Sequence, residues 1–579
     1  MVSKLRKTHF KRQSVSDYLI KRIQSYGVDH VFGVPGDYIL TFFSKMVHSN
    51  GLEVINTCDE QSAAFAADAY ARIRGLGVVC VTFSVGGLKV VNAVAQAFSE
   101  KSPLVVISGA PGINERSNSR FLPHHKVQNF DTQQKIFEHL TIDSALIQDR
   151  FSAASDIDRV ISSAVTCKLP AYLELPRDVG ESTIVKTHKR HYDFSAKQFH
   201  GGNSLLEHIH DKTDGNTLRE AVTESLGMIK SSKRPVIIAG VEVHRFGLQD
   251  KLLQLAKRTK IPIVSTLLSK SVVSEDNIHY LGVYAGNMSH EHVQKYVESS
   301  DCVIMIGVFL TNVNFGITSH PIDKSRCIYL SMDNVTVKFH TYKHIRFEDF
   351  LDVLIKKIPE KKSHYKEIFS GKLGYNIQHL NSANQTSINS SNKITVKGLF
   401  KILDTFLSEN NIVIADVGDS SFGSIDLITQ RSNFLSPAYY LSMGFAVPAS
   451  IGAQLANSKL RPIVIVGDGA FQMTGMDVST IAMLNLNPII IVLNNNGYRT
   501  ERAILDGKFN NIQRWNYSKI PNVIGKGKGF VVETEEQFKK SLADSKKSNN
   551  EYCLLDVILD TYDSSSALQR LSEGIRKKI

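Results

Sequence analysis

The amino-acid sequence predicts an α/β protein with three doubly wound, parallel-sheet domains. Short runs of β-branched residues, such as VVCV and PIVIV, recur without alternating polar residues, which is typical of strands buried on both faces of a parallel sheet. Many of these runs lead into a turn of small residues and then into a stretch with helical periodicity, as in βαβ units. The 579 residues suffice for about three or four domains of common size.

The composition excludes several classes of protein. Hydrophobic residues make up 42% of the chain, and no apolar run reaches the length of a membrane span, so we expect no membrane segment. The basic start, MVSKLRKTHFKRQ, is not followed by an apolar segment, and we expect no secretory signal. Cysteines 58, 80, 167, 302, 327 and 553 form no CxxC pair and are predicted to be reduced thiols of a cytoplasmic protein.

The net charge of +12 raises the question of nucleic-acid binding. Much of the excess lies in the first 24 residues, in 186–212 and at the C-terminal Arg-Lys-Lys. A base-stacking surface requires aromatic residues interleaved with basic ones, and no basic stretch of this chain has that pattern. We therefore expect a solvated basic surface that mildly attracts anionic substrates, and no nucleic-acid partner.

Residues 13–182 are predicted to form the first domain. It opens with a helix from Val15 to Tyr26, and VFGVPGD then gives a short strand and a turn that carries Asp37. A second strand leads to Glu60 at the start of an alanine-rich helix.

Two parts of the chain follow the same plan. VVCVTFSVGG and SPLVVISGAPG in the first domain parallel PIVIVGDGAF and NPIIIVLNNNG near the C-terminus. The two regions look like diverged copies of one unit, and convergence of two ordinary βαβ units is the alternative. The first copy lacks the Asp and Asn that the second places after its strands.

Two polar stretches, 183–215 and 361–392, have no sustained periodicity and are predicted to be linkers. The first contains five histidines, whose spacing fits no standard metal site. Between the linkers, RPVIIAG, IPIVST, CVIMIG and CIYLSMD alternate with helical stretches and predict a second α/β domain over 216–360. The third domain is predicted over 393–579.

One βαβ unit of the third domain carries most of the chemistry. A buried strand over 462–466 leads into Gly467-Asp468-Gly469, and a second strand over 488–493 ends on NNNG. The intervening helix is predicted from the spacing of its apolar residues Phe471, Met476, Ile481 and Leu484. Both strand ends lie at the carboxyl edge of the sheet, where open α/β sheets bind ligands.

The residues at this edge suit a diphosphate held through Mg²⁺. The Asp468 carboxylate, the Asn495 side-chain carbonyl and the Gly497 main-chain carbonyl are hard oxygen donors that leave positions for phosphate oxygens. The glycines allow backbone N–H groups and the helix N-terminus to approach the phosphates. The alternative is an ordinary βαβ turn in which Asp468 caps the helix.

Taken together, the motifs resemble those of one known family. GVPGDY, the Glu60 segment, His124-His125 in FLPHHKV, and GDG with NNNGYRTERAI are similar to the thiamine-diphosphate (ThDP)-dependent 2-keto acid decarboxylases. That family includes pyruvate, indolepyruvate and phenylpyruvate decarboxylases. The resemblance runs from Val31 to the end and is weakest in the linkers. It implies a pyrimidine-binding first domain, a middle domain and a diphosphate-binding third domain.

The resemblance also implies roles for the cofactor-binding residues. Glu60 would hydrogen-bond the pyrimidine and allow the ylid to form, and the alanine-rich helix after it predicts apolar surroundings that favour a protonated carboxyl. Met443 would support the bent cofactor, the Leu441 carbonyl would accept the pyrimidine amine, and Asp419 falls beside the pyrimidine. The full set of expected cofactor contacts is Glu60, Asp419, Ser420, Leu441, Met443, Gly467, Asp468, Gly469, Ala470, Asn495 and Gly497.

Four residues match the proton-relay group of that family, namely Asp37, His124, His125 and Glu501. They would protonate the enamine intermediate and later release the aldehyde. Adjacent histidines on a strand point to opposite faces, so His124 and His125 are predicted to lie on a loop.

Three positions depart from the family pattern. Ser84 stands where members often have Gly, and Arg499 and Thr500 stand where members have Thr and Ile or Val. Arg499 is a candidate to alter substrate binding or to pair with a carboxylate. Val417 is polar in some relatives and favours an apolar substrate pocket.

The leading hypothesis is a cytoplasmic enzyme that uses ThDP and Mg²⁺ to decarboxylate a 2-keto acid to an aldehyde and CO₂. An aromatic substrate such as indolepyruvate or phenylpyruvate is expected. The resemblance implies a homodimer, or a dimer of dimers, with each active site between subunits. The alternatives are a pyruvate decarboxylase, a ThDP-dependent carboligase similar to acetolactate synthase, and a catalytically silent scaffold with the same fold.

Overall fold

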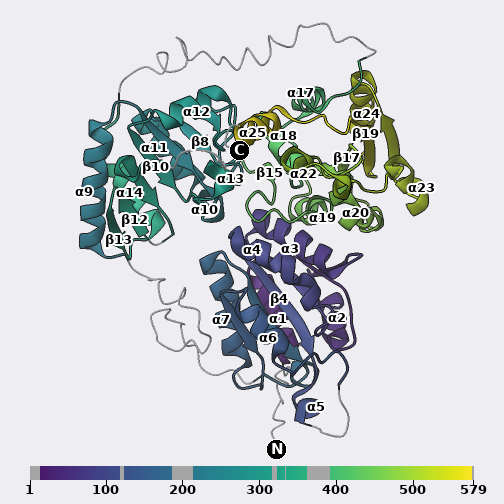
Figure 1. Cartoon of the computed structure of the whole chain (residues 1–579). Helices are drawn as coiled ribbons and strands as arrows, with labels where there is room; N and C mark the ends of the chain where they lie inside the picture. The colour runs from purple at the N-terminus through teal and green to yellow at the C-terminus, as the bar shows by residue number, and fades with distance from the viewer. Residues whose placement is uncertain are drawn as a thin grey trace, which may run out of the picture. The chain divides into compact units, whose positions relative to one another are not determined.

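The computed structural model describes residues 13–117, 123–184, 213–315, 322–332, 334–361 and 392–576. The chain forms two compact units, of which the first contains one β-sheet and the second contains two (Figure 1). Most residues of the two predicted linkers lie outside the described residues, and so do all five histidines of the first linker.

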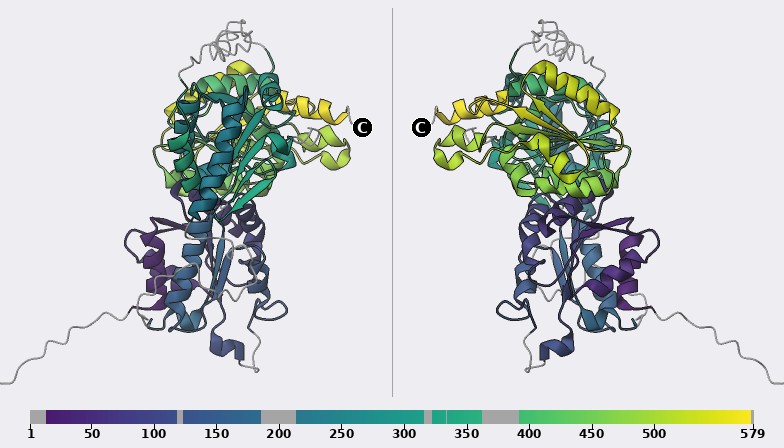
Figure 2. Two further views of the ribbon diagram at one scale, coloured as in Figure 1. Left: turned by 90° about the vertical axis from the view of Figure 1, so that its left-hand side faces the viewer. Right: turned by 90° about the vertical axis from the view of Figure 1, so that its right-hand side faces the viewer.

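The first unit is built on a six-stranded parallel sheet in the order β2-β1-β3-β4-β6-β5, with helices on both faces (Figure 2). β3 and β4 are buried along their whole length, which explains their non-alternating β-branched sequences. In chain order the elements are α1 (Val15–Ser25), β1 (His30–Gly33), α2 (Leu40–Val47), β2 (Glu53–Asn56), α3 (Glu60–Arg74), β3 (Gly77–Val81), α4 (Val91–Ser99), β4 (Leu104–Ala110), α5 (Ile113–Ser117), α6 (Thr132–Glu138), β5 (Asp143–Leu146), α7 (Ala153–Cys167), β6 (Ala171–Pro176) and α8 (Arg177–Gly180).

The first sheet of the second unit has seven strands in the order β13-β12-β11-β10-β7-β8-β9. It is parallel except for β12 and β13, which form an antiparallel hairpin at one edge. This hairpin was not predicted, because its turn at Lys338 and Phe339 carries no Asn-Gly or Asp-Gly signal. The elements are α9 (Gly215–Ser231), β7 (Pro235–Ala239), α10 (Val241–Arg245), α11 (Gln249–Thr259), β8 (Ile263–Ser265), β9 (Tyr280–Val283), α12 (Glu291–Glu298), β10 (Cys302–Ile306), α13 (Asn312–Phe315), β11 (Cys327–Leu330), β12 (Asn334–Val337), β13 (His340–Lys343) and α14 (Phe347–Lys357).

The second sheet of this unit is again six-stranded and parallel, in the order β15-β14-β16-β17-β19-β18. The elements are α17 (Val396–Phe406), β14 (Asn411–Ala415), α18 (Asp419–Gly423), β15 (Phe434–Leu435), α19 (Ala446–Ala456), β16 (Arg461–Gly467), α20 (Asp468–Thr474), α21 (Val478–Met483), β17 (Ile489–Asn494), α22 (Arg499–Ile504), α23 (Ile520–Ile524), β18 (Lys528–Val532), α24 (Glu535–Lys547), β19 (Cys553–Ile558) and α25 (Ser566–Arg576). The predicted fold class is therefore confirmed for all three sheets.

The two six-stranded sheets have the same topology. Reading across each sheet, β3 and β4 occupy the places that β16 and β17 occupy in the other. These are the strands whose sequences parallel one another, so the repeat predicted from sequence extends to the whole strand order. The shared order agrees with diverged copies of one unit.

The predicted helix between β16 and β17 is not continuous. α20 ends at Thr474, a 3₁₀ turn over Gly475–Asp477 follows, and α21 begins at Val478. A Cβ on Gly475 would lie 2.3 Å from the ring of Phe471, so the chain turns where only glycine fits. Met476 lies in this 3₁₀ turn and is 43% exposed, so one of the four apolar residues from which the helix was predicted lies outside it.

A buried ion pair links the two sheets of the second unit. The Lys270 ammonium pairs with Glu275 and donates to the Leu427 carbonyl at 2.7 Å. Glu275 Oε2 in turn accepts hydrogen bonds from the Thr429 N–H and hydroxyl, both at 2.9 Å. Removing one partner from a buried pair of this kind costs about 3–5 kcal/mol.

Within the described ranges, no helix is both long and apolar enough to traverse a lipid bilayer. The six cysteines form no disulfide in the described residues, and all of them except Cys58 are buried, in line with the prediction of reduced cysteines.

Candidate active site

Asp468 connects the ends of the two central strands of the third sheet. It follows β16 directly, and its Oδ1 accepts the Gly469 N–H at 2.8 Å. Its Oδ2 accepts the N–H groups of Asn496 at 2.7 Å and of Gly497 at 3.1 Å, in the turn after β17. The helix N-cap is Gly467, so Asp468 organises two strand ends and does not cap the helix through its side chain.

Asn495 offers an unused oxygen at the same edge. Its Oδ1 is buried and has no hydrogen-bond partner among the described residues. The preceding Asn494 points elsewhere, because its Nδ2 donates to Asp556 at 2.7 Å. An unpaired buried acceptor costs about 1–3 kcal/mol, so the Asn495 oxygen is suited to a ligand.

Gly497 completes the turn in a conformation that only glycine adopts readily. Its φ is 144°, and a Cβ there would lie 2.1 Å from the Asn510 carbonyl oxygen. Burial raises the pKa of the neighbouring Asp468 carboxyl to about 6, although hydrogen bonds from backbone N–H groups act in the opposite direction. A divalent cation beside this carboxylate would favour its ionised form.

These residues line one cavity of about 460 Å³ within the second unit. Every cofactor-contact residue predicted in the third domain lines it, and so does Glu501 at the start of α22. The cavity also has an apolar lining from several elements, which includes Met288, Val313, Val417, Phe422, Ala503, Ile504, Leu568 and Leu571.

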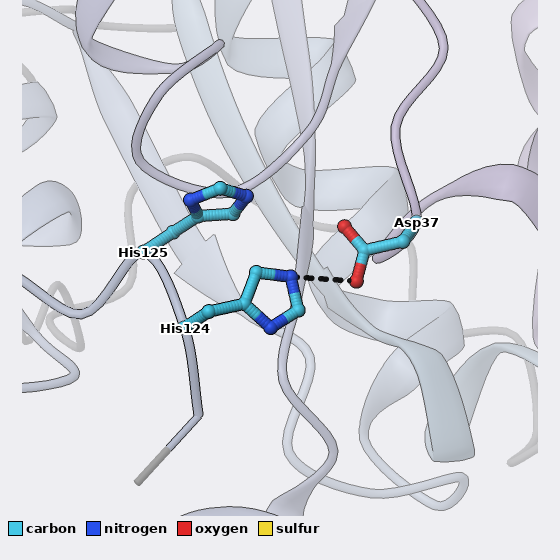
Figure 3. Close-up of side chains that lie close together, drawn as sticks. All are labelled: Asp37, His124 and His125. Atoms are coloured by element: carbon cyan, nitrogen blue, oxygen red, sulfur yellow. Dashed lines mark ion pairs between the residues drawn. The ribbon is translucent and has the colours of Figure 1, made fainter.

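The first unit brings together a second group of predicted residues (Figure 3). His124 Nε2 lies 2.9 Å from Asp37 Oδ2, and the rings of His124 and His125 meet edge to face at 4.4 Å. The Tyr38 hydroxyl lies 3.2 Å from His124 Nδ1, which orients that ring. As predicted, the histidines lie outside any strand, and His125 has a φ of 65°. The cluster can exchange protons between neighbouring imidazole and carboxyl groups.

Comparisons with known proteins agree with this arrangement. Family models described as thiamine pyrophosphate enzyme N-terminal TPP binding domain, central domain and C-terminal TPP binding domain match residues 13–136, 222–347 and 416–557. Indole-3-pyruvate decarboxylase of Azospirillum brasilense is 30% identical over 571 residues, covering 97% of this chain and 98% of that protein. The chain belongs to the ThDP-dependent 2-keto acid decarboxylase family.

Other relatives carry related names. Pyruvate decarboxylase of Hanseniaspora uvarum is 29% identical over 570 residues, covering 95% of this chain and 96% of the relative. Pyruvate decarboxylase 2 of Arabidopsis thaliana is 30% identical over 560 residues, covering 95% and 89%. The chain is thus an enzyme of 2-keto acid decarboxylation, of a family that uses ThDP together with Mg²⁺.

The residues at the carboxyl edge fit this cofactor. Asp468 supplies a carboxylate, Asn495 an unpaired oxygen, and Ser420 a buried hydroxyl that likewise has no partner among the described residues. All three line the same cavity. Hard oxygen donors of this kind suit Mg²⁺, and a hydroxyl suits a polar group of a ligand.

Glu60 lies at the N-terminus of α3, as predicted, but its surroundings are not only apolar. Its neighbour Asp59 caps the helix by accepting the Gln61 N–H at 2.7 Å. The Lys89 ammonium pairs with Asp59 and lies 3.3 Å from Glu60 Oε2. The alanines of α3 are buried in the core of the unit, so the apolar environment predicted for Glu60 overlooked a cation.

Asp416 holds a loop that lines the cavity, and the sequence analysis missed this role. It is fully buried, and its carboxylate accepts the N–H groups of Val417 at 2.9 Å, Gly444 at 3.1 Å and Ala446 at 2.8 Å. These bonds fix the loop that carries Leu441, with a φ of 63°, and Met443. Burial raises the Asp416 pKa to about 6. The available signal was an aspartate directly after the buried strand NIVIA.

Asp419 uses both carboxylate oxygens within the protein. Oδ2 accepts the Ser565 N–H at 2.8 Å, and Oδ1 accepts the hydroxyl of the same serine. Burial raises the pKa of Asp419 to about 6. Asp419 lines the cavity as the sequence suggested. Its carboxylate, however, is bonded to Ser565, which lies 146 positions away in the chain.

Within the described residues, the Arg499 guanidinium bonds main-chain carbonyls and forms no ion pair with a carboxylate, although its charge opposes the rise that burial causes in the pKa of Asp419. Its Nε donates to the carbonyls of Tyr562 at 3.0 Å and Asp563 at 3.1 Å, and its guanidinium also lies 3.3 Å from the Ser564 hydroxyl. Another departure, Ser84, adopts a left-handed φ of 57°, and its N–H donates to Gln133 Oε1 at 2.6 Å. That conformation explains why glycine suits this position in relatives.

Proposed function

We propose that this chain converts a bulky aromatic 2-keto acid into the corresponding aldehyde and CO₂. The observation that carries the proposal is a single cavity with hard oxygen donors at one part of its lining and apolar side chains over the rest. A cavity of that composition suits a charged diphosphate together with an apolar substrate side chain. The relative at 30% identity that is named indole-3-pyruvate decarboxylase supports the same substrate class.

The metal ligands in this proposal are Asp468, Asn495 and the Gly497 carbonyl. Gly467, Gly469 and Ala470 lie at the β16–α20 turn, where backbone N–H groups can face the phosphates. Met443 and the Leu441 carbonyl support the organic rings, and Asp416 holds their loop in place. Bound ThDP supplies the nucleophilic carbon and the electron sink that decarboxylation needs.

The remaining roles are proton transfers by side chains of this protein. Glu60 exchanges a proton with the pyrimidine ring from its position at the N-terminus of α3. Asp37 orients His124 through the contact at 2.9 Å, so that His124 and His125 deliver and remove protons at the substrate carbon. Glu501 shares in these transfers from the first turn of α22.

The proposed active enzyme is a cytoplasmic homodimer or a dimer of dimers. Glu60 belongs to one compact unit and Asp468 to the other, and one cofactor has to reach both residues. Pairing between two copies of the chain meets this requirement through an isologous interface.

The substrate class is tested by kcat/KM for pyruvate, a branched-chain keto acid, phenylpyruvate and indolepyruvate with saturating ThDP and Mg²⁺. We expect the aromatic substrates to exceed pyruvate by at least about tenfold. A higher kcat/KM for pyruvate would contradict the aromatic assignment and match the relatives named pyruvate decarboxylase.

A further inference from the structure

The C-terminal helix α25 forms part of the cavity wall. It contacts α18 and α22 of the third sheet's domain (Figure 1). Leu568 and Leu571 on this helix are buried and line the cavity, beside Phe422 of α18 and Ala503 of α22. The position of α25 therefore determines how much room a substrate side chain finds there.

Asp419 holds the first turn of this helix. Ser565, the residue before α25, donates both its N–H and its hydroxyl to the Asp419 carboxylate. The Ser565 hydroxyl oxygen also accepts the Leu568 N–H at 3.1 Å, as an N-cap residue does. The Asp419 carboxylate thus fixes the start of α25. Through Ser565 it also fixes Leu568, which lines the cavity.

Arg499 holds the segment that leads into the helix. Its side chain leaves the first turn of α22 and bonds the carbonyls of Tyr562 and Asp563. A planar guanidinium with five donors can bond several acceptors at fixed angles, which a lysine ammonium on a flexible stem does less well. Further along α25, the Arg570 guanidinium donates a hydrogen bond to the Met288 carbonyl at 2.6 Å, which also holds the helix in place.

We propose that Arg499 and Asp419 are positioning residues that clamp α25 against the cavity and thereby set the affinity for the keto acid. They act through Leu568 and Leu571, and neither needs to touch the reacting atoms. The proposal rests on the proposed function for its effect on substrate, but the clamp itself is a property of the chain without cofactor. Removing either the Arg499 or the Asp419 side chain should widen the cavity and expose the backbone amides of 562–573 to solvent.

The test compares Arg499→Met, Arg499→Lys and Asp419→Asn in the full-length holoenzyme, with Arg431→Met as a control for loss of an exposed arginine. Arg431 forms its ion pair with Asp250 at the surface. For Arg499→Met we expect KM to rise about tenfold while kcat stays within about threefold, and Arg499→Lys to recover part of the loss. Asp419→Asn is assessed by KM and by hydrogen exchange, because Asp419 also lines the cavity. The control should match the wild type in both parameters.

Hydrogen exchange measured by mass spectrometry tests the clamp without any reliance on activity. In the cofactor-free chain, peptides covering 562–573 should exchange at least about tenfold faster in Arg499→Met than in the wild type, with no change over β16 and β17. Unchanged exchange in both clamp variants would overturn the proposal. Faster exchange in a chain that decarboxylates no keto acid would support the clamp while refuting the proposed function.

Discussion

Replacing Asn495 with alanine separates a ligand role from a structural one. The substitution removes a side-chain oxygen that is buried and unpaired, and such an oxygen costs about 1–3 kcal/mol. The side chain is small, so the lost packing offsets only part of that relief. We therefore expect the free energy of unfolding of the cofactor-free chain to change by no more than about 1 kcal/mol.

The same substitution should weaken cofactor binding, because it removes one metal ligand. A ligand present at 100 times its Kd stabilises the folded state by about 2.7 kcal/mol, and a tenfold loss of affinity removes about 1.4 kcal/mol of this. Thermal midpoints of domains of 150–250 residues move by about 2–4 °C per kcal/mol. The upward shift produced by ThDP and Mg²⁺ should thus shrink by about 3–6 °C in Asn495→Ala.

Thermal unfolding with and without ThDP and MgCl₂ measures both effects, and calorimetric titration gives the affinity directly. Asn494→Ala is the matched control, because the Oδ1 of Asn494 is likewise buried and unpaired among the described residues. Its Nδ2 bonds Asp556, however, and the cavity is lined by Asn495 and not by Asn494. The control should lose stability in both conditions and keep the cofactor-induced shift. If ThDP and Mg²⁺ raised the thermal midpoint of Asn495→Ala as much as that of the wild type, the ligand role would be refuted. A large loss of stability in the cofactor-free variant would show that Asn495 has a structural role.

Three further substitutions or mixtures probe the rest of the account. Glu60→Gln should keep the thermal midpoint but lower CO₂ release by at least about a hundredfold, the range of general acid–base catalysis; near-normal turnover would remove Glu60 from the mechanism. Asp416 has a folded pKa of about 6 against an ordinary value of 3.8, so its contribution to stability is present at low pH and lost as pH rises through 6. Relative to Asp416→Asn, the wild type should therefore lose about 2 kcal/mol between pH 4 and pH 7 in denaturant titrations, and a constant difference would show that the pKa is unshifted. Mixing inactive Glu60→Gln and Asp468→Ala chains under subunit exchange should restore activity, whereas mixed dimers without activity would place both residues of each site in one chain.

Much of the fold and part of the site follow from local sequence patterns. β16 and β17 are uninterrupted β-branched strands, and their ends carry Asp468 and Asn495 because parallel strands meet at one edge. The turn residue Gly497, with a φ of 144°, marks where the backbone must bend tightly. Each of these signals lies within a few residues of the feature it predicts.

The missed features depend on contacts between distant parts of the chain. Asp419 and Ser565 are 146 residues apart, and no local pattern links them. Asp416 bonds a loop 28 to 30 residues away, and Lys89 reaches Glu60 from the next βα turn. The break at Gly475 is local, but it depends on how close the Phe471 ring comes. Tertiary packing decides the first three and the position of the Phe471 ring decides the fourth, so periodicity alone does not reveal them.

The product balance of the purified enzyme tests the central claim most directly. With phenylpyruvate, ThDP and Mg²⁺, CO₂ and phenylacetaldehyde should appear in equal amounts, and removal of both ThDP and Mg²⁺ should abolish the reaction. A hydroxyketone as the main product, or turnover that persists after both have been removed, would contradict the assignment as a ThDP-dependent 2-keto acid decarboxylase.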